Sequence, residues 1–317
     1  MMIIQEILNK VEQYDSIVIF GHKNPDGDCY GTQVGLKELL KSLYPHKNIY
    51  IIGSGYSRMI PFIMPMDVVS DEVVDASLGI AVDFNELSRS EDQRIHNVKE
   101  LIVIDHHIPN EVFGDIRLVD TSKVACAEII AKIVIDLDIK LSASGYNALY
   151  LGLATDSGRF MYPPFSGDTL RIGAYLLDKG ADAEHIYDVI YESDESHLEL
   201  RKYIYTHYKK TENGLIYILF TKDDINKLGI SIYKATGFVN TLGNIKGLPV
   251  WAAFAEDETG IVRVEVRSTW PVVQPIMKAH GGGGHPHAAG CTAHSLEEVY
   301  DIIKELDDLI AKGENND

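Results

Sequence analysis

One acidic residue and two histidines directly follow a short apolar stretch, residues 101–104. This stretch is rich in β-branched side chains, which is typical of a strand buried on both faces. It leads into Asp105, His106 and His107. Ligand sites in open α/β sheets lie just beyond the carboxyl ends of such strands. Two adjacent histidines also occur by chance or inside a core, so a functional interpretation requires matching side chains from other strands.

Two other predicted strands and one predicted helix also lead into acidic residues or histidines. An apolar strand over residues 16–20 leads into a loop in which Pro25 and Gly27 exclude a helix. A second apolar strand, over residues 77–82, ends on a carboxylate, and a helix that Ser142 can cap ends near another. The side chains in question are His22, Asp26 and Asp28 on the loop, Asp83 after the strand and Asp156 at the helix end.

Carboxylates together with neutral imidazoles are the ligands of a hard or borderline cation such as Mn²⁺ or Mg²⁺. This set is larger than one ion needs. Asp26 and Asp28, two positions apart, can address two neighbouring ions while another carboxylate bridges them, and the four aspartates offset the charge of two divalent cations. We therefore expect a site for two divalent cations, Mn²⁺ or Mg²⁺, with Co²⁺ as an alternative.

The charge of the chain restricts its partners. The 317 residues have a formal net charge of −18, which argues against coating long nucleic acid, because such binding needs many Lys and Arg contacts to phosphate. A small anionic substrate remains compatible, since bound divalent metals reverse the local sign. No apolar run is long enough for a membrane span, and the N-terminus lacks the basic region of a signal peptide. Three cysteines without metal-type spacing favour a reducing, cytoplasmic setting. A homodimer is possible.

Strands alternate with helices up to about residue 190, which predicts a doubly wound parallel sheet and hence an α/β fold. Residues 1–192 would form this catalytic domain, 193–211 a helical connector, and 212–317 a smaller α+β domain with a mixed sheet. In the strand predicted over 261–268, Val262, Val264 and Val266 would face the core, and Arg263, Glu265 and Arg267 the opposite side.

A run of four glycines, Gly281–Gly284, precedes His285. Glycine backbone N–H groups can approach an anion closely, so the run is a candidate substrate-binding loop. A flexible turn is the alternative interpretation.

Taken together, these motifs resemble the DHH phosphoesterase superfamily, which is named for a triplet seen here as Asp105–His107. Its first motif resembles residues 22–28, its second Val82–Asp83 and its fourth Thr155–Phe160, and residues 281–290 resemble the associated DHHA1 domain. The likeness extends over nearly the whole chain. The subgroup it resembles most is the nanoRNase type, which comprises bifunctional oligoribonucleases and 3′-phosphoadenosine 5′-phosphate phosphatases.

The resemblance implies roles for individual residues. His22, Asp26 and Asp83 would hold one Mn²⁺, and Asp28, Asp83, His106 and Asp156 the other. His107 would lie beside the substrate phosphate, and Asp105 would orient its neighbours. In the second domain the nucleotide would be gripped by Arg267, His285 and the backbone of Gly282, Gly283 and Gly284. The chain departs from the pattern at Cys29, Thr32 and Phe84, where alanine, serine and threonine are common, and no departure removes a ligand.

The implied activity is that of a metal-dependent phosphoric ester hydrolase, of the exoribonuclease and 3′(2′),5′-bisphosphate nucleotidase type. It would act on short RNA or DNA oligonucleotides and on 3′-phosphoadenosine 5′-phosphate by a two-metal mechanism. The alternatives are a cyclic or linear dinucleotide phosphodiesterase, an exopolyphosphatase-like phosphatase, and a nucleotide-sensing protein without catalysis. The complete ligand set argues against the last, and the Arg267 and glycine-loop apparatus suits a nucleotide better than polyphosphate.

Overall fold

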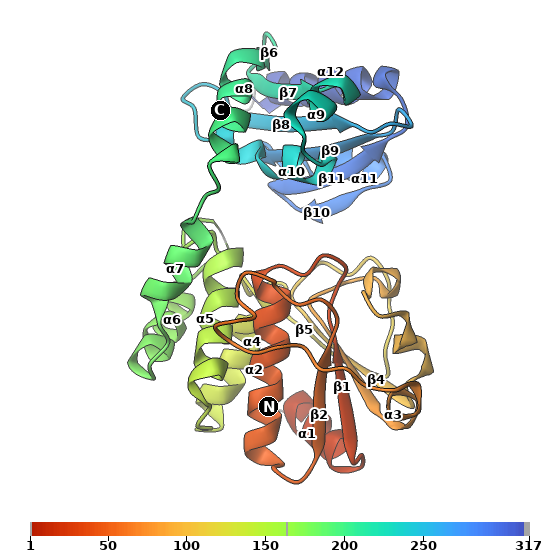
Figure 1. The fold of residues 1–317 in the computed structure, drawn as a ribbon, viewed down its shortest axis with the longest axis vertical. Coiled ribbons are helices and arrows are strands. Elements are labelled where there is room, and N and C mark those ends of the chain that lie inside the picture. Colours follow the sequence, from red (N-terminus) through yellow and green to blue (C-terminus); the bar gives the residue numbers. More distant parts are fainter. Residues whose placement is uncertain (1, 163, 314–317) are drawn as a thin grey trace. The chain divides into compact units, whose positions relative to one another are not determined.

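The computed structural model describes residues 2–162 and 164–313. The chain divides into two compact units, the first ending at Glu192 and the second beginning at Ser193 (Figure 1). None of the helices in the described ranges combines the length and apolar character that crossing a lipid bilayer requires.

The first unit is built on a five-stranded parallel sheet in the order β2-β1-β3-β4-β5. The strands are β1 (Ser16–Phe20), β2 (Asn48–Ile52), β3 (Leu78–Val82), β4 (Glu100–Asp105) and β5 (Ile116–Val119). The chain moves outward from β1 to β2 and then returns to the other side of β1 for β3. The direction of winding therefore reverses between β1 and β3, where open α/β sheets bind their ligands.

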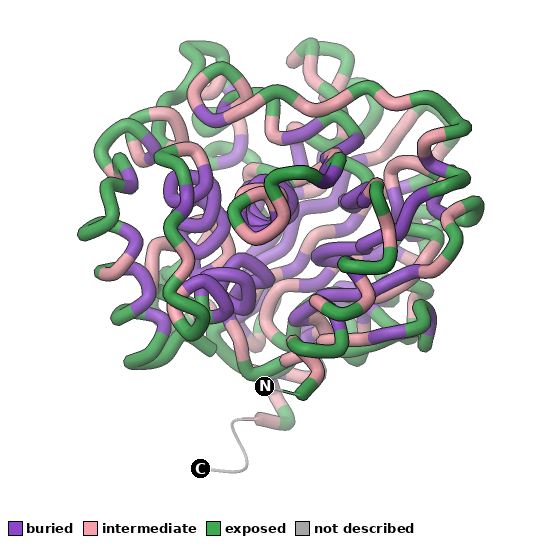
Figure 2. Tube along the Cα trace, turned by 90° about the horizontal axis from the view of Figure 1, so that it is seen from below, coloured by how far each residue is buried: buried purple, intermediate pink, exposed green. Residues whose placement is uncertain are grey.

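Helices cover both faces of this sheet. Ile17 and Ile19 of β1 face a large core formed with α1 (Met2–Glu12), α2 (Gly27–Leu43), α4 (Cys126–Asp136) and α5 (Ala143–Asp156) (Figure 1). Val18 and Phe20 face the opposite core, to which α3 (Asp71–Ala76) and the 3₁₀ helix Gln93–Asn97 contribute. A second 3₁₀ helix covers Leu87–Arg89, and α6 (Gly167–Asp178) and α7 (Ala183–Tyr191) complete the unit. Figure 2 shows buried residues concentrated in the strands and in the inner helices. The predicted doubly wound parallel sheet is confirmed.

Glycines of α2 lie directly against α5, where a side chain would collide with it. We expect Gly31→Ala to destabilise the first unit by about 1–3 kcal/mol, the usual cost of overpacking a core. A β-carbon at residue 31 would lie 2.3 Å from the carbonyl oxygen of Ala148 in α5, so the helices would have to separate. Thermal and urea unfolding measure the loss.

Gly237→Ala is the matched control for Gly31→Ala. Gly237 is also helical, and a β-carbon there would meet no atom within 4 Å. Equal destabilisation by both substitutions would show that backbone entropy, and not the contact between α2 and α5, governs the effect of Gly31.

The second unit contains a six-stranded mixed sheet in the order β10-β11-β9-β8-β7-β6, in which only β7 and β8 are parallel. Its strands are β6 (Lys209–Lys210), β7 (Leu215–Phe220), β8 (Val250–Glu256), β9 (Val262–Ser268), β10 (Gly283–His285) and β11 (Ala288–Ala293). One face packs on α11 (Gln274–Ala279) and α12 (Leu296–Gly313). The other packs on α8 (Ser196–His207), α10 (Ile232–Gly237) and the 3₁₀ helix Val239–Leu242, and α9 (Lys222–Leu228) lies beside β7 and β8.

Two predictions from the sequence can be compared with the structure of this unit. In β9 the three valines are buried and the intervening charged residues are half-buried on the other face, as predicted. Helix α8 lies within the segment predicted as a connector, and its Leu200 and Ile204 pack into the second unit's core. Residues 193–211 therefore include a helix that forms part of the second unit.

Candidate metal centre

His22 and Asp83 follow the two strands between which the winding reverses. His22 comes just after β1, and its Nε2 lies 3.5 Å from Oδ2 of Asp83, which directly follows β3. The same nitrogen lies 3.8 Å from Oδ1 of Asp26. The other ring nitrogen, Nδ1, donates to the carbonyl oxygen of Lys23 at 2.9 Å. Because a carbonyl only accepts, this bond assigns the proton to Nδ1 in the neutral ring and leaves the Nε2 lone pair directed at the carboxylates.

His106, which follows β4, completes the cluster. Its Nε2 lies 3.4 Å from Oδ1 of Asp83, 3.2 Å from Oδ2 of Asp156 and 3.8 Å from Oδ2 of Asp28. Its Nδ1 lies 3.2 Å from the carbonyl oxygen of Lys123, which fixes the tautomer in the same way as for His22. Asp83 therefore has Oδ2 directed at His22 and Oδ1 directed at His106. This is the placement required of a carboxylate that bridges two cations.

The prediction that Asp28 lies on a loop is wrong. Helix α2 begins at Gly27, so Asp28 belongs to its first turn. Asp26 is the N-cap, and its Oδ1 accepts hydrogen bonds from the backbone N–H groups of Asp28 and Cys29, both at 3.0 Å. Pro25 and Gly27 do not oppose this start, because proline and glycine are tolerated at and before the first helical position, where backbone N–H groups have no helical partner.

Asp28 also anchors a second helix. Its carboxylate accepts hydrogen bonds from the backbone N–H groups of Cys126 and Ala127 at the start of α4, at 2.6 and 2.9 Å. The side chain is fully buried. The sequence gives no sign of this contact, because the two partners are separated by about a hundred residues along the chain.

Asp105 bonds to the two histidines that follow it. Its Oδ1 accepts hydrogen bonds from the backbone N–H of His106 at 2.8 Å and from Nδ1 of His107, also at 2.8 Å. Asp105 is 1% exposed, whereas His107 is only half-buried. Nδ1 of His107 is therefore held by Asp105.

Several buried carboxylates lie close together here, and their negative charge favours a bound cation. Burial and the charges of Asp83 and Asp156 raise the pKa of Asp28 well above its ordinary value, and burial raises the pKa of Asp156 to about 6. Burial alone would lower the pKa of His22, but its contacts with Asp26 and Asp83 raise it. Oδ1 of Asp83 is buried and accepts no hydrogen bond from the described residues. Divalent cations would neutralise this negative charge, and the oxygen and imidazole donors suit Mn²⁺ or Mg²⁺.

Cys29 is a neighbour of the cluster whose position sequence reasoning missed. Ligand atoms of His22, Cys29 and Asp83 all lie within 4.8 Å of one another, and all three residues are buried. The Cys29 sulfur accepts a hydrogen bond from the His22 backbone N–H at 3.3 Å. Burial raises the pKa of the Cys29 thiol to about 11. The sequence gives no sign of this contact, because it depends on how the first turn of α2 packs beside the segment that follows β1.

Two of the predicted substrate-binding residues, Arg267 and His285, lie in one row across three strands of the second unit. Arg267 of β9 is in register with Ala288 of β11, and Ala288 is in register with His285 of β10. Residues in register lie on the same face of a sheet, so Arg267 and His285 share a face, two strand spacings or about 10 Å apart. Nη1 of Arg267 lies 3.1 Å from Oε2 of Glu265.

Only the second half of the glycine run lies in a strand, because Gly281 is in a turn and Gly282 has no regular secondary structure. Gly283 and Gly284 begin β10, which pairs with β11 as an antiparallel hairpin. A β-carbon on Gly282 would lie 2.0 Å from the carbonyl oxygen of Gly290. Close packing against β11 thus accounts for part of the glycine content.

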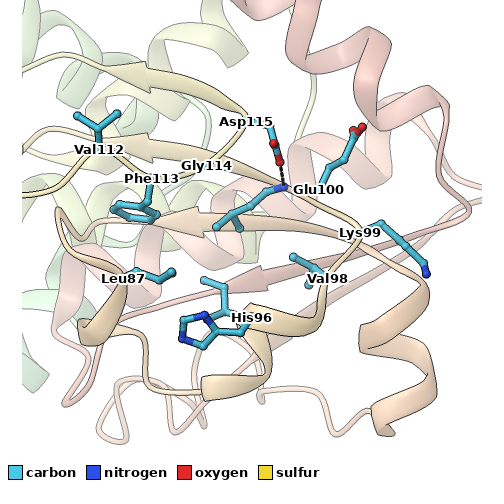
Figure 3. A pocket seen from close by; sticks show the side chains of 11 residues that line it. Leu87, His96, Val98, Lys99, Glu100, Val112, Phe113, Gly114 and Asp115 are labelled. Carbon is cyan, nitrogen blue, oxygen red and sulfur yellow. Dashed lines mark hydrogen bonds between the residues drawn. The ribbon is translucent and has the colours of Figure 1, made fainter.

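A separate hollow of about 360 Å³ lies at the opposite end of β4, away from His106 (Figure 3). Apolar side chains, including Leu101 and Phe113, line it together with four polar residues: His96, Lys99, Glu100 and Asp115. Oδ2 of Asp115 accepts the Leu101 backbone N–H at 2.8 Å, and Glu100 pairs with Lys10 at 2.7 Å. No predicted site residue lines this hollow.

Similarity to known proteins places this geometry in a family. Residues 16–153 match the model of the DHH family, N-terminal domain, and residues 234–312 match that of the DHHA1 domain. The chain is 32% identical to a Bacillus subtilis (strain 168) protein named bifunctional oligoribonuclease and PAP phosphatase NrnA, over 98% of this chain and 99% of that protein. It is 34% identical to a Streptococcus mutans protein named probable bifunctional oligoribonuclease and PAP phosphatase NrnA, over 96% of this chain and 98% of that protein.

A solved structure is also similar. The crystal structure of an exopolyphosphatase-related protein from Bacteroides fragilis superposes with a TM-score of 0.84 at 25% identity, covering 97% of this chain and 96% of that chain. The DHH match precedes the DHHA1 match along the chain, and the relatives align over nearly its full length. Both findings agree with the motifs at the ends of β1, β3 and β4. The chain belongs to the DHH/DHHA1 phosphoesterase family.

Proposed function

We propose that this phosphoesterase hydrolyses short oligonucleotides and 3′-phosphoadenosine 5′-phosphate with the help of two Mn²⁺ ions. The observation that carries the proposal is the position of Asp83, whose two oxygens are directed at His22 and at His106. The names of the relatives from Bacillus subtilis and Streptococcus mutans support the choice of substrates.

Two groups of residues would hold the ions. His22, Asp26 and Asp83 form one group, and Asp28, His106 and Asp156 form the other, with Asp83 shared. When bound, such ions make a water molecule acidic and neutralise charge on the phosphoryl oxygens. The backbone carbonyls of Lys23 and Lys123 keep the two ligand histidines in the required tautomer.

His107 would donate a proton or a hydrogen bond to the phosphoryl or leaving oxygen through Nε2. Asp105 would act as a positioning residue, because its hydrogen bond at Nδ1 orients the ring.

We expect Asp105→Asn to lower kcat by about 10–100-fold, the usual effect of removing such a supporting partner. The amide keeps the shape of the carboxylate and loses its charge, so the hydrogen bond that orients Nδ1 of His107 is weaker while the six proposed ligands remain. Steady-state kinetics and titration with Mn²⁺ distinguish the two effects, and Mn²⁺ affinity should change less than kcat.

Asp115→Asn is the matched control for Asp105→Asn. Asp115 also accepts a backbone hydrogen bond from β4, but at the strand end away from the site. If both variants lost activity equally, a general disturbance of β4 would explain the result and the assigned role of Asp105 would be wrong.

In the second unit, we propose that Arg267 and His285 bind the phosphate and the nucleotide together with the backbone of Gly282, Gly283 and Gly284. The guanidinium supplies hydrogen-bond donors in a fixed geometry that suits phosphate. The separation of Arg267 and His285 along the row, about 10 Å, is comparable with the size of a small ligand.

Polyphosphate hydrolysis is the second candidate, since the similar solved structure is called exopolyphosphatase-related. The deciding experiment is a substrate panel with product analysis: RNA and DNA of two to five nucleotides, 3′-phosphoadenosine 5′-phosphate, linear and cyclic dinucleotides, and polyphosphate. We expect activity to disappear after chelation, to return with Mn²⁺, and to be highest on short RNA and 3′-phosphoadenosine 5′-phosphate. A higher kcat/KM on polyphosphate would overturn the substrate assignment.

A further inference from the structure

We propose that Cys29 is a conditional sulfur ligand of the His22–Asp83 site, engaged by thiophilic cations such as Zn²⁺ or Cd²⁺ and left unbound by Mn²⁺ or Mg²⁺. This inference rests on the metal centre of the proposed function. It adds a residue that is outside the ligand set described above, and it predicts which ions inhibit the enzyme.

The position of the sulfur supports this role. Cys29 lies in the first turn of α2, is fully buried, and has its sulfur within 4.8 Å of the ligand atoms of His22 and Asp83. With Zn–S and Zn–N bonds of about 2.3 and 2.1 Å, two ligands of one tetrahedral ion are roughly 3.5 Å apart. A small side-chain adjustment would therefore bring all three donors onto one ion.

The surroundings keep the sulfur at this place. A β-carbon on Gly21 would lie 2.6 Å from the Cys29 sulfur, so the absence of a side chain at residue 21 leaves the space that the sulfur fills. The sulfur accepts a hydrogen bond from the His22 backbone N–H at 3.3 Å, and because a thiol sulfur carries two lone pairs, one is left for a cation.

Ligand softness determines which cations use this sulfur. Thiolates select Zn²⁺ and softer cations, whereas carboxylates and water suit Mg²⁺ and Mn²⁺. When the metal–sulfur bond forms, the thiol proton is released to buffer, and no oxidant is required. Cys29 would join His22, Asp83 and Asp26, whose Oδ1 lies 3.8 Å from Nε2 of His22. Four protein ligands close a tetrahedral site and leave no position for water, so Zn²⁺ bound in this way would inhibit hydrolysis.

The other two cysteines provide matched controls. Cys126 donates to the carbonyl oxygen of Ile104 at 3.3 Å, and Cys291 lies in β11 of the second unit. Within the described residues, neither belongs to a group of side chains placed to hold a metal.

The test is titration of the metal-free protein with Cd²⁺, followed by ultraviolet absorption. We expect a thiolate-to-cadmium charge-transfer band in the unchanged protein and in Cys291→Ala, and its loss in Cys29→Ala. In competition with Mn²⁺, the Zn²⁺ concentration for half inhibition should rise at least about 10-fold in Cys29→Ala, the lower end of what losing a supporting partner costs a metal site. Cys29→Ser, nearly equal in size, gives the same comparison if the alanine variant does not fold.

The outcomes separate this inference from the proposed function. Cd²⁺ binding without a charge-transfer band, or a band that persists in both Cys29 variants, would overturn the role of Cys29 and leave the Mn²⁺ centre standing. Failure of the protein to bind either Mn²⁺ or Cd²⁺ would instead overturn the metal centre itself, and with it both proposals.

Discussion

Asp83→Asn should lower Mn²⁺-dependent kcat by at least about 10³-fold, as losing one strong electrostatic contact to a transition state does. Asp83 is the only residue in the proposed ligand set that approaches both histidines, with Oδ2 3.5 Å from His22 and Oδ1 3.4 Å from His106. The amide removes the charge that would bridge the two ions. Kinetics with short RNA measure the loss, and titration of Mn²⁺ should show fewer or weaker ions bound.

Asparagine is the right replacement because of the backbone at this residue. Asp83 has a φ of 65°, in the left-handed region, which asparagine tolerates better than alanine does. The variant therefore removes charge without adding backbone strain. Asp67→Asn is the matched control, since Asp67 also bonds to the sheet, through the Ile51 backbone N–H, and lies outside the cluster. Activity within about 10-fold of the unchanged protein would be incompatible with a bridging role for Asp83.

The clustering of His22, Asp83 and His106 could be predicted from the sequence because these residues obey a simple rule. His22, Asp83 and His106 each follow a buried apolar strand, and the carboxyl ends of parallel strands meet at one edge. The order β2-β1-β3-β4-β5, which places the ends of β1 and β3 side by side, could not be read from composition or spacing. The rule therefore identified the residues of the cluster, but not which of them lie next to one another.

The misplacement of Asp28 has a local cause. Pro25 and Gly27 are strong helix breakers in the middle of a helix, but Asp26 between them provides the cap from which α2 starts. The contacts of Asp28 with α4, of Lys123 with His106 and of Cys29 with His22 were missed for a different reason. Each joins a side chain to the backbone of another residue, and such contacts depend on tertiary packing and have no sequence signature.

The sequence likewise could not predict that Arg267, Ala288 and His285 lie in one row across the sheet. Alternation in β9 predicted which way Arg267 points, and the glycine run marked residues 281–284. Only the register of β9, β11 and β10 shows that Arg267 and His285 lie opposite the same residue. A slip of one residue would place them on opposite faces.

Arg267→Ala should raise KM for short RNA and for 3′-phosphoadenosine 5′-phosphate by about 10–100-fold, since a hydrogen bond to a charged group contributes about 1.5–3 kcal/mol. We expect kcat to change less than KM, and Mn²⁺ affinity to be unaffected, because none of the proposed metal ligands lies in the second unit. Steady-state kinetics and Mn²⁺ titration provide the two measurements.

Arg263→Ala is the control that separates position from charge. Arg263 lies on the same face of β9, loses the same charge, and bonds to the same carboxylate, with Nη2 2.6 Å from Oε1 of Glu265. It stacks on the Tyr233 ring, with 4.8 Å between the guanidinium carbon and the ring centroid, and its partner in β11 is Thr292, far from His285 along the strand.

If both substitutions raised KM equally, general electrostatic attraction would explain the effect. If Mn²⁺ affinity fell while KM stayed constant, the assignment of Arg267 to substrate would be wrong. A rise in KM confined to Arg267→Ala is expected only if the row shared with His285 contacts the substrate.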